Sequence, residues 1–302
     1  MPPTTITAQP WKTLTIMSFS DQFKILSQYL MPQHGLSIAA GKLADVKTEW
    51  VKNLFIQKFA KAYNIDMSNA IEPELTKYAC FNDFFTRAID LETRPIDDDD
   101  NSFCSPVDGA MSQFGRINNG KIIQAKNHDY STLEILGGDT DRAEAFKQGE
   151  FCTIYLAPKD YHRIHMPCDG KLTAMSHIPG KLFSVNPLTA NNVPNLFARN
   201  ERVVSYFDTE FGKFAMVSVG ATIVGSIETV WAGNVTPPSC KEVRTWEYEN
   251  EQQIELKKGE EMGRFKLGST VVLLMEKANW QWHDSIKLEA DLQLGQKLVT
   301  KG

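Results

Sequence analysis

The 302-residue sequence has few of the features that mark membrane-spanning, secreted or nucleic-acid-binding proteins. No apolar run reaches the length of a membrane span, and the first residues have no signal-peptide pattern. The net charge is −5, which argues against nucleic acid as the main partner. Internal repeats and low-complexity segments are also absent. We therefore expect a protein that is made and kept in the cytoplasm.

Cysteine is scarce and is not arranged as a metal or disulfide framework. The five cysteines are an odd number, widely spaced, with no Cys-x-x-Cys pair, so we predict reduced core thiols. His162 and His165 are three positions apart, but a metal pair would need a third ligand, such as Asp108 or His128. Their spacing is not that of a known zinc motif, and we predict that no metal is bound.

The first 75 residues differ in pattern from the rest of the chain. Phe19, Phe23, Leu26 and Leu30 recur at helical spacing, with Ser18 or Ser20 available as an N-cap. A second helical stretch is predicted after Pro32 and Gly35, with these apolar members: Val46, Trp50, Val51, Leu54, Phe55 and Phe59. Lysines are interleaved with them, which suits the surface of an anionic bilayer. The alternative is that the apolar face packs on the main domain, and both hold if the helices lie between that domain and lipid.

The sequence beyond residue 75 predicts a second region of a different class. Asn82 to Ala88 is predicted to be a short helix, and Asp97 to Asp100 a solvated connection. After residue 102, turn residues punctuate short β-branched runs, among them 151–156, 215–219 and 221–227. We predict an α+β fold, with N-terminal helices at 1–75 and a mostly antiparallel β domain at 76–302.

Leu267-Gly268-Ser269-Thr270 stands at the start of a buried strand that continues to Met275. A serine after glycine can attack the carbonyl of its own preceding residue, if a histidine steered by a carboxylate takes its proton. The resulting ester can undergo β-elimination, and loss of ammonia then leaves a pyruvoyl group at position 269. Taken alone, Gly-Ser-Thr before a strand is usually a turn. Likewise, an isolated histidine is usually a core residue, and Asp108 between Pro106 and Gly109 can be a turn residue.

Several segments together resemble the signatures of bacterial phosphatidylserine decarboxylases. The similarity covers nearly the whole chain, in the same order. The segments are Ser105-Pro106-Val107-Asp108-Gly109, Asp160-Tyr161-His162-Arg163-Ile164-His165-Met166-Pro167, Leu182 to Pro187, Asn195 to Arg202, Gly220 to Gly233, and Phe265-Lys266-Leu267-Gly268-Ser269-Thr270.

The resemblance implies a role for each matching residue. Asp108, His165 and Ser269 match the self-processing triad of the family, and His162 matches the histidine that it uses in decarboxylation. Cleavage between Gly268 and Ser269 would give a β chain of residues 1–268 and an α chain of residues 269–302, with a pyruvoyl cofactor derived from Ser269. The implied reaction converts phosphatidylserine to phosphatidylethanolamine and CO2 through a Schiff base, which makes the protein a carboxy-lyase.

The resemblance also implies partners and a location. We expect a peripheral enzyme on the cytoplasmic side of the inner membrane, in contact with an anionic lipid surface. The two cleaved chains would stay together, and a homodimer is expected. Arg199 or Arg202 could bind the anionic groups of the substrate, although an exposed ion pair is the alternative for either.

Two other functions stay open at this point. A metal-dependent hydrolase using His162, His165 and Asp108 would keep its chain intact and lose activity with a chelator. A non-catalytic lipid-surface protein would bind vesicles even after Ser269 and both histidines were replaced.

Overall fold

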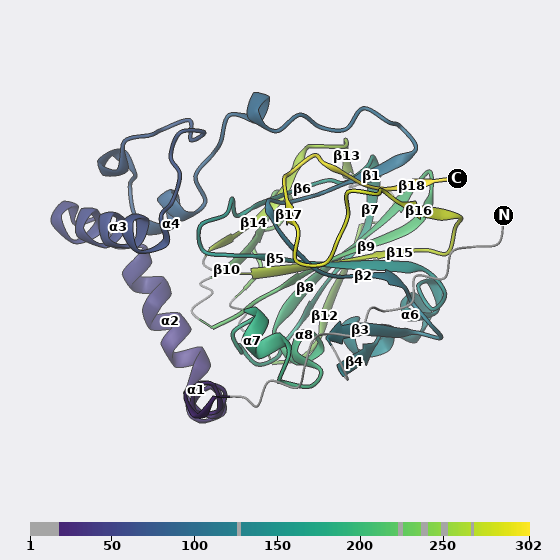
Figure 1. The fold of residues 1–302 in the computed structure, drawn as a ribbon, viewed down its shortest axis with the longest axis horizontal. Helices are drawn as coiled ribbons and strands as arrows, with labels where there is room; N and C mark the ends of the chain where they lie inside the picture. Colours follow the sequence, from purple (N-terminus) through teal and green to yellow (C-terminus); the bar gives the residue numbers. More distant parts are fainter. Residues whose placement is uncertain (1–17, 126–127, 223–225, 237–240, 249–252, 267–268) are drawn as a thin grey trace.

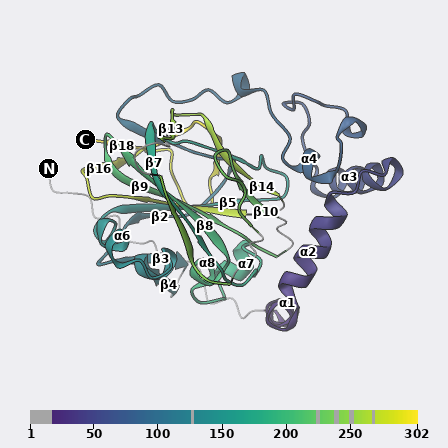
Figure 2. The ribbon, with the colours of Figure 1, turned by 180° about the vertical axis from the view of Figure 1, so that it is seen from behind.

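The computed structural model describes residues 18–125, 128–222, 226–236, 241–248, 253–266 and 269–302. Helices come first along the chain, and antiparallel sheets follow, so the predicted α+β class is confirmed (Figure 1). The first four helices lie on one side of the β domain in both views, the side on which strands β10 (Ser226–Thr229) and β14 (Glu261–Lys266) lie, with α1 farthest from these strands (Figures 1 and 2). The predicted division at residue 75 stays a prediction.

The helices are longest in the N-terminal region. They are α1 (Phe19–Leu30), α2 (Gln33–Ala44), α3 (Glu49–Tyr63), α4 (Phe81–Phe85), α5 (Thr132–Ile135), α6 (Thr140–Ala145), α7 (Pro187–Ala190) and α8 (Leu196–Arg199). Two 3-10 turns, η1 and η2, lie at Leu75–Lys77 and Leu91–Thr93. Among the described residues, no helix is both long and apolar enough to cross a bilayer.

The largest sheet forms the centre of the β domain. Its strands are, in order, β12 (Arg244–Glu247), β7 (Gly170–Ile178), β8 (Arg202–Thr209), β9 (Gly212–Val219), β15 (Ser269–Met275), β5 (Glu150–Leu156), β2 (Gly109–Arg116) and β17 (Asp291–Leu292), with β13 (Glu255–Leu256) also paired to β7. All these neighbours are antiparallel.

Three smaller sheets surround the large one. A four-stranded sheet has the order β11 (Gly233–Asn234), β10, β14, β6 (Arg163–His165). A three-stranded sheet has the order β1 (Ser102–Cys104), β18 (Lys297–Lys301), β16 (Trp280–Trp282), and β3 (Lys121–Ala125) pairs with β4 (His128–Ser131).

Strand β15 is buried on both faces, which explains its continuous apolar run. Val271, Leu273 and Met275 belong to one core cluster, whereas Val272 and Leu274 belong to a second cluster on the opposite face. Because side chains alternate along a strand, β15 is packed between the two cores. Ser269, its first residue, is thereby held in the interior.

The N-terminal helices agree with the sequence in part. Helix α1 begins after Ser18, whose side chain accepts a hydrogen bond from the amide of Asp21 at 3.1 Å, as the capping pattern predicts. The prediction of one continuous helical stretch after Gly35 was wrong, because α2 ends at Ala44 and α3 starts only after the N-cap position Thr48. Val46 therefore lies between two helices. The short helix predicted at 82–88 is α4, which ends at Phe85.

Polar groups dock the first helices on the β domain. Gln28 accepts a hydrogen bond from the amide of Ser184, and Gln33 accepts one from the amide of Leu182, both at 2.8 Å. Tyr29 packs edge-on against Phe183, with ring centroids 5.0 Å apart. Ile25 of α1 packs against a core cluster of the β domain, whereas other apolar side chains of the helix are exposed, including Phe19 at 86% and Leu30 at 77%.

Candidate active site

The ends of four neighbouring strands gather the predicted site residues at one edge of the large sheet. Ser269 opens β15 and is paired with Leu156, the last residue of β5. Thr270 is paired with Val219, which ends β9. Asp108 immediately precedes β2, whose Ala110 is paired with Tyr155 of β5. The antiparallel register therefore brings Asp108, Ser269 and the segment after Leu156 to the same edge.

Glycine is required where β2 begins. A Cβ atom at Gly109 would lie 2.5 Å from the carbonyl oxygen of Tyr155, too close for any other residue without a shift of the backbone. This close approach holds the Asp108 turn against β5. The Pro-x-Asp-Gly pattern therefore has a steric basis at its glycine.

Ser269 is fully buried, and its Oγ has no hydrogen-bond partner among the described residues. Buried hydroxyls are nearly always hydrogen-bonded, because an unpaired one loses its solvation without replacement. A buried hydroxyl without a partner is a group that is not committed to stabilising the fold. It is available as a nucleophile. Leu267 and Gly268, the other half of the predicted cleavage site, lie outside the described residues.

His162 is also fully buried and uncommitted. Its ring stacks on Phe85 of α4 at a centroid distance of 4.0 Å, and neither ring nitrogen has a hydrogen-bond partner among the described residues. Burial, together with the positive charge of Arg87, lowers the pKa of His162 to about 3, against the influence of the Ala157 and Pro158 carbonyls. The imidazole is therefore neutral at pH 7. Ala157, whose carbonyl acts on His162, directly follows Leu156, the strand partner of Ser269. The side chains of His162 and Ser269 therefore lie in the same region of the protein.

His165 lies at the end of β6 and has a defined tautomer. Its Nδ1 is 2.8 Å from the carbonyl oxygen of Gly259, and its Nε2 is 3.0 Å from the hydroxyl of Tyr161. A carbonyl only accepts, so Nδ1 carries the proton and Nε2 accepts from Tyr161. Burial lowers the pKa of His165, while the Gly259 hydrogen bond and the charges of Glu261 and Asp108 act to raise it. His165 is thus a neutral base with its lone pair at Nε2.

Asp108 is held by partners other than His165 in this structure. Arg94 donates to both carboxylate oxygens, with its Nη2 2.9 Å from Oδ2, and the amide of Leu294 donates to Oδ1 at 2.8 Å. The amide of His165 does bond to the carbonyl of Pro106, which places β6 beside the Asp108 turn. The carboxylate therefore acts on His165 through its charge, and the position at Nδ1 that a triad aspartate would occupy is taken by Gly259.

The two arginines predicted for substrate binding make different contacts. Arg202 is buried and donates three hydrogen bonds to the carbonyls of Ile135, Asn200 and Glu134 at 2.6–2.7 Å. Arg199 lies over the rings of Phe183 and Tyr29. The contacts of Arg202 connect the start of β8 to the segment 134–135, and those of Arg199 connect α8 to Phe183 and to α1. A substrate-binding role for either residue stays a prediction.

Four residues near the site were not singled out by the sequence analysis. Tyr161 stands inside the quoted histidine segment, and this position was the signal that could have identified it. Arg94 and Gly259 carry no local pattern that points to Asp108 or His165. Arg87 follows α4 and is 4% exposed. Its burial is a property of the folded chain, and no motif in the sequence indicates it. Within the described part of the chain, no three His, Cys, Asp or Glu side chains are grouped as a set that could hold a metal ion.

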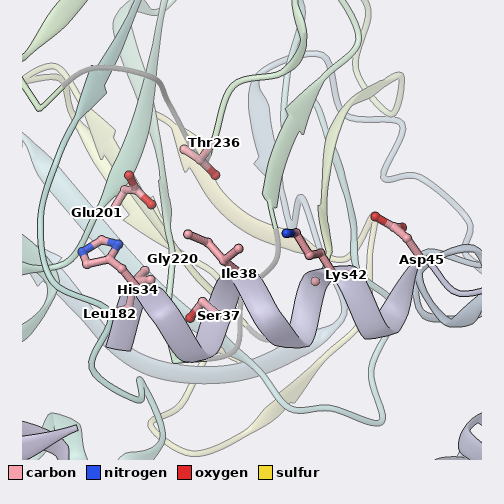
Figure 3. A pocket seen from close by; sticks show the side chains of 10 residues that line it. His34, Ser37, Ile38, Lys42, Asp45, Leu182, Glu201, Gly220 and Thr236 are labelled. Carbon is pink, nitrogen blue, oxygen red and sulfur yellow. The ribbon is translucent and has the colours of Figure 1, made fainter. Parts of the chain in front are cut away.

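A pocket of about 270 Å³ lies between α2 and this edge of the sheet (Figure 3). Ile38 and Lys42 of α2 face Glu201 and Leu182 of the β domain across it. Gly220 also lines the pocket, and it follows Val219, the strand partner of Thr270. The pocket therefore joins the N-terminal helices to the edge of the sheet where Ser269 lies.

Comparison with known proteins gives a consistent match. A family model described as phosphatidylserine decarboxylase matches residues 81–300, and a model described as PSD matches residues 23–64. The phosphatidylserine decarboxylase proenzyme of Shewanella halifaxensis is 58% identical over 279 residues, covering 91% of this chain and 97% of that protein. The proenzymes of the same name from Hahella chejuensis and Vibrio cholerae are 56% and 53% identical, covering 93% and 91% of this chain and 95% and 98% of the respective proteins. The chain therefore belongs to the phosphatidylserine decarboxylase family.

Proposed function

We propose that this chain is a proenzyme that cuts itself between Gly268 and Ser269 and then converts phosphatidylserine to phosphatidylethanolamine and CO2. The observation that carries the proposal is the buried Oγ of Ser269, which has no hydrogen-bond partner among the described residues and opens a strand in the segment that matches the family. The neighbouring hydroxyls of Thr270 and Thr153 also have no partner in the described part of the chain, so Ser269 is distinguished by its place in that segment as well as by its hydroxyl.

The self-cleavage step uses His165 as the base. Nε2 takes the hydroxyl proton of Ser269, and Oγ attacks the carbonyl carbon of Gly268, so that an ester replaces the amide bond. The charge of Asp108 stabilises the imidazolium that forms. β-Elimination then releases residues 1–268 with a carboxylate at Gly268. The dehydroalanine left at position 269 exchanges its nitrogen for water oxygen, and ammonia is released.

The surroundings of Ser269 fit a pyruvoyl group. The group is uncharged and no larger than the serine from which it derives, and position 269 is fully buried. A pyruvoyl carbonyl condenses with the amine of the substrate and takes up the electrons released when CO2 leaves.

His162 is the proposed donor of the proton that replaces CO2 at Cα. Neither ring nitrogen has a hydrogen-bond partner of standard geometry among the described residues, although the carbonyls of Ala157 and Pro158 lie near enough to act on its pKa. Because the positive charge of Arg87 contributes to its low pKa, an anion placed near Arg87 would raise that pKa and favour the acidic form. Binding of an anionic substrate would therefore prepare the acid.

The N-terminal helices are proposed to rest on an anionic membrane surface at the cytoplasmic side of the inner membrane. Phe19, Phe23, Leu26 and Leu30 of α1 are 58–86% exposed, and Trp50 of α3 is 73% exposed. Exposed apolar side chains on amphipathic helices bind the boundary between headgroups and acyl chains. The pocket behind α2 then lies between this surface and the site. The homodimer implied by the family resemblance stays a prediction.

Replacement of the serine tests the function. Ser269→Ala is compared with the wild type and with Ser205→Ala, a control that removes a buried hydroxyl from β8 of the same sheet. Wild type and Ser205→Ala should run as two fragments and release CO2 from phosphatidylserine labelled in the serine carboxyl group. Ser269→Ala should remain one chain of 34.0 kDa and release none. Decarboxylation by intact Ser269→Ala would overturn the proposal.

A further inference from the structure

Arg87 forms no ion pair with a carboxylate among the described residues. The residue is 4% exposed, its Nη2 donates to the carbonyl oxygen of Lys159 at 3.1 Å, and its guanidinium lies 5.8 Å from the centroid of the Phe84 ring. Its Nε and Nη1 are buried and have no hydrogen-bond partner among the described residues. A buried guanidinium is normally paired with a carboxylate or bonded to several carbonyls, because its charge loses solvation on burial.

The other arginines near the site, of which Arg202 is buried and Arg94 and Arg163 are half-buried, follow that rule. Arg94 is paired with Asp108, and Arg163 donates to Glu261 and to the carbonyl of Thr86. Arg202 donates to three carbonyls. Arg87 differs from all three in keeping two nitrogen atoms without an acceptor.

Arg87 is also placed beside the proposed acid. Phe85, two residues earlier, stacks on the ring of His162, and the Lys159 carbonyl bonded by Arg87 is three residues before that histidine. The charge of Arg87 is near enough to lower the pKa of His162. An anion held by Arg87 would therefore lie next to the atoms on which His162 acts.

We infer that Arg87 binds the phosphodiester of the phospholipid headgroup through its Nε and Nη1 donors, which have no acceptor among the described residues. Phosphatidylserine offers two anions, the phosphodiester and the carboxylate that is lost. A cation held on the carboxylate would stabilise the substrate more than the transition state, because the negative charge leaves that group as CO2 forms. The phosphodiester keeps its charge throughout the reaction, so an arginine on it contributes to binding without opposing the chemistry. This inference rests on the proposed function.

The test uses Arg87→Gln, with Arg142→Gln as the control. Arg142 is an ion-paired arginine on α6, bonded to Asp139 and Glu247. Self-cleavage, whose proposed steps use no substrate, reports whether each variant is folded. In the mature Arg87→Gln enzyme, KM for phosphatidylserine should rise about 10- to 100-fold, the factor for one lost charge-assisted hydrogen bond. The kcat should change much less, and Arg142→Gln should match the wild type.

A second readout separates the two anions. The product phosphatidylethanolamine has the phosphodiester but no carboxylate, and cyanoborohydride can trap its amine on the mature enzyme. The phosphatidylethanolamine concentration for half-maximal trapping should rise by the same factor as KM. Unchanged trapping with a raised KM would assign Arg87 to the carboxylate and overturn the inference, and so would an unchanged KM.

The outcomes keep this inference apart from the proposed function. If the wild type itself neither cleaves nor decarboxylates, the proposed function fails. If only Arg87→Gln fails to cleave, Arg87→Lys decides, because it keeps a cation but not the planar set of donors. A KM for Arg87→Lys raised at least threefold supports the inference. If Arg87→Lys has the KM of the wild type, or if it also fails to cleave, Arg87 is a residue needed for folding, and the inference is overturned.

Discussion

The Nδ1 atom of His165 lies 2.8 Å from the carbonyl oxygen of Gly259, and this contact determines which ring nitrogen acts as the base. With Nδ1 protonated, the lone pair at Nε2 is occupied by the hydroxyl of Tyr161 at 3.0 Å. If His165 is the base for Ser269, as proposed, Tyr161 would compete with Ser269 for the same nitrogen. The hydroxyl of Tyr161 would then hold the base back.

Removing that hydroxyl should not block self-cleavage. We expect Tyr161→Phe to cleave at least as fast as the wild type, because Nε2 becomes available to Ser269. His165→Ala should not cleave, because the proposed base is lost. Time courses of fragment formation after synthesis in a cell-free system measure both rates. A Tyr161→Phe chain as inert as His165→Ala would show that the tyrosine assists the base.

His162 should be dispensable for cleavage and required for turnover. We expect His162→Gln to give both fragments and to lower kcat by about 10²- to 10⁴-fold, the usual contribution of a general acid. Fragment formation and CO2 release are measured on the same preparation. A fully processed His162→Gln enzyme with wild-type kcat would assign the acid to another group.

Acid should destabilise the precursor through the same histidine. His162 is neutral when folded, with a pKa of about 3, and titrates near 6.5 when unfolded. Below pH 6.5 the unfolded chain therefore binds more protons, and the free energy of unfolding falls as the pH decreases. From pH 6.5 to 5 this histidine alone should lower it by about 2 kcal/mol.

Urea unfolding of Ser269→Ala, with and without His162→Phe, measures this effect on an uncleaved chain. Phenylalanine preserves the stacking on Phe85 and does not titrate. The variant should lose about 2 kcal/mol less than its parent over this range. Identical pH dependence in the two chains would contradict the buried, neutral state of His162.

The ion pair between Arg94 and Asp108 should stabilise the fold as well as position a charge. Both side chains are 13% exposed, so solvent screens the pair only in part. In the Ser269→Ala background, Arg94→Gln and Asp108→Asn should each lower the free energy of unfolding by about 1–3 kcal/mol. The double variant should lose less than the sum, because either change alone breaks the same bonds. Additive losses would mean that the pair contributes nothing.

Lipid binding should depend on α1 and be separable from self-cleavage. We expect Phe23→Gln with Leu26→Gln to weaken binding to anionic vesicles at least about tenfold, since apolar burial is lost, and to leave cleavage unchanged. Val230→Gln with Leu288→Gln removes exposed apolar side chains from the β domain and serves as the control. Vesicle sedimentation measures binding. An equal loss of vesicle binding in the two double variants would show that α1 binds lipid no more than the β domain does.

Local patterns were sufficient where a single segment determines its own structure. The continuous apolar run after Ser269 predicts β15, because a strand buried on both faces needs no alternation. Ser18 before an apolar repeat likewise predicts the start of α1. The break between α2 and α3 was missed because the apolar spacing around Val46 continues a helical pattern that the backbone does not follow.

Contacts between distant segments could not be read from such patterns. Gly259 reaches His165 through a backbone carbonyl, 94 positions away, which no side-chain motif reveals. The solvated connection expected at 97–100 is found in part: Asp98 and Asp100 are exposed, whereas Asp97 is half-buried and pairs with Lys258 and Lys297. The importance of Arg87 depends on its burial and its missing acceptors, which only the folded chain defines.

Intact-mass spectrometry of the purified, denatured protein tests self-cleavage at Ser269 most directly. Our account predicts two species divided after Gly268, with the fragment of residues 269–302 lighter by one ammonia than a fragment that begins with serine. A single species at the full 34.0 kDa, unchanged after prolonged incubation with anionic lipid, would contradict it.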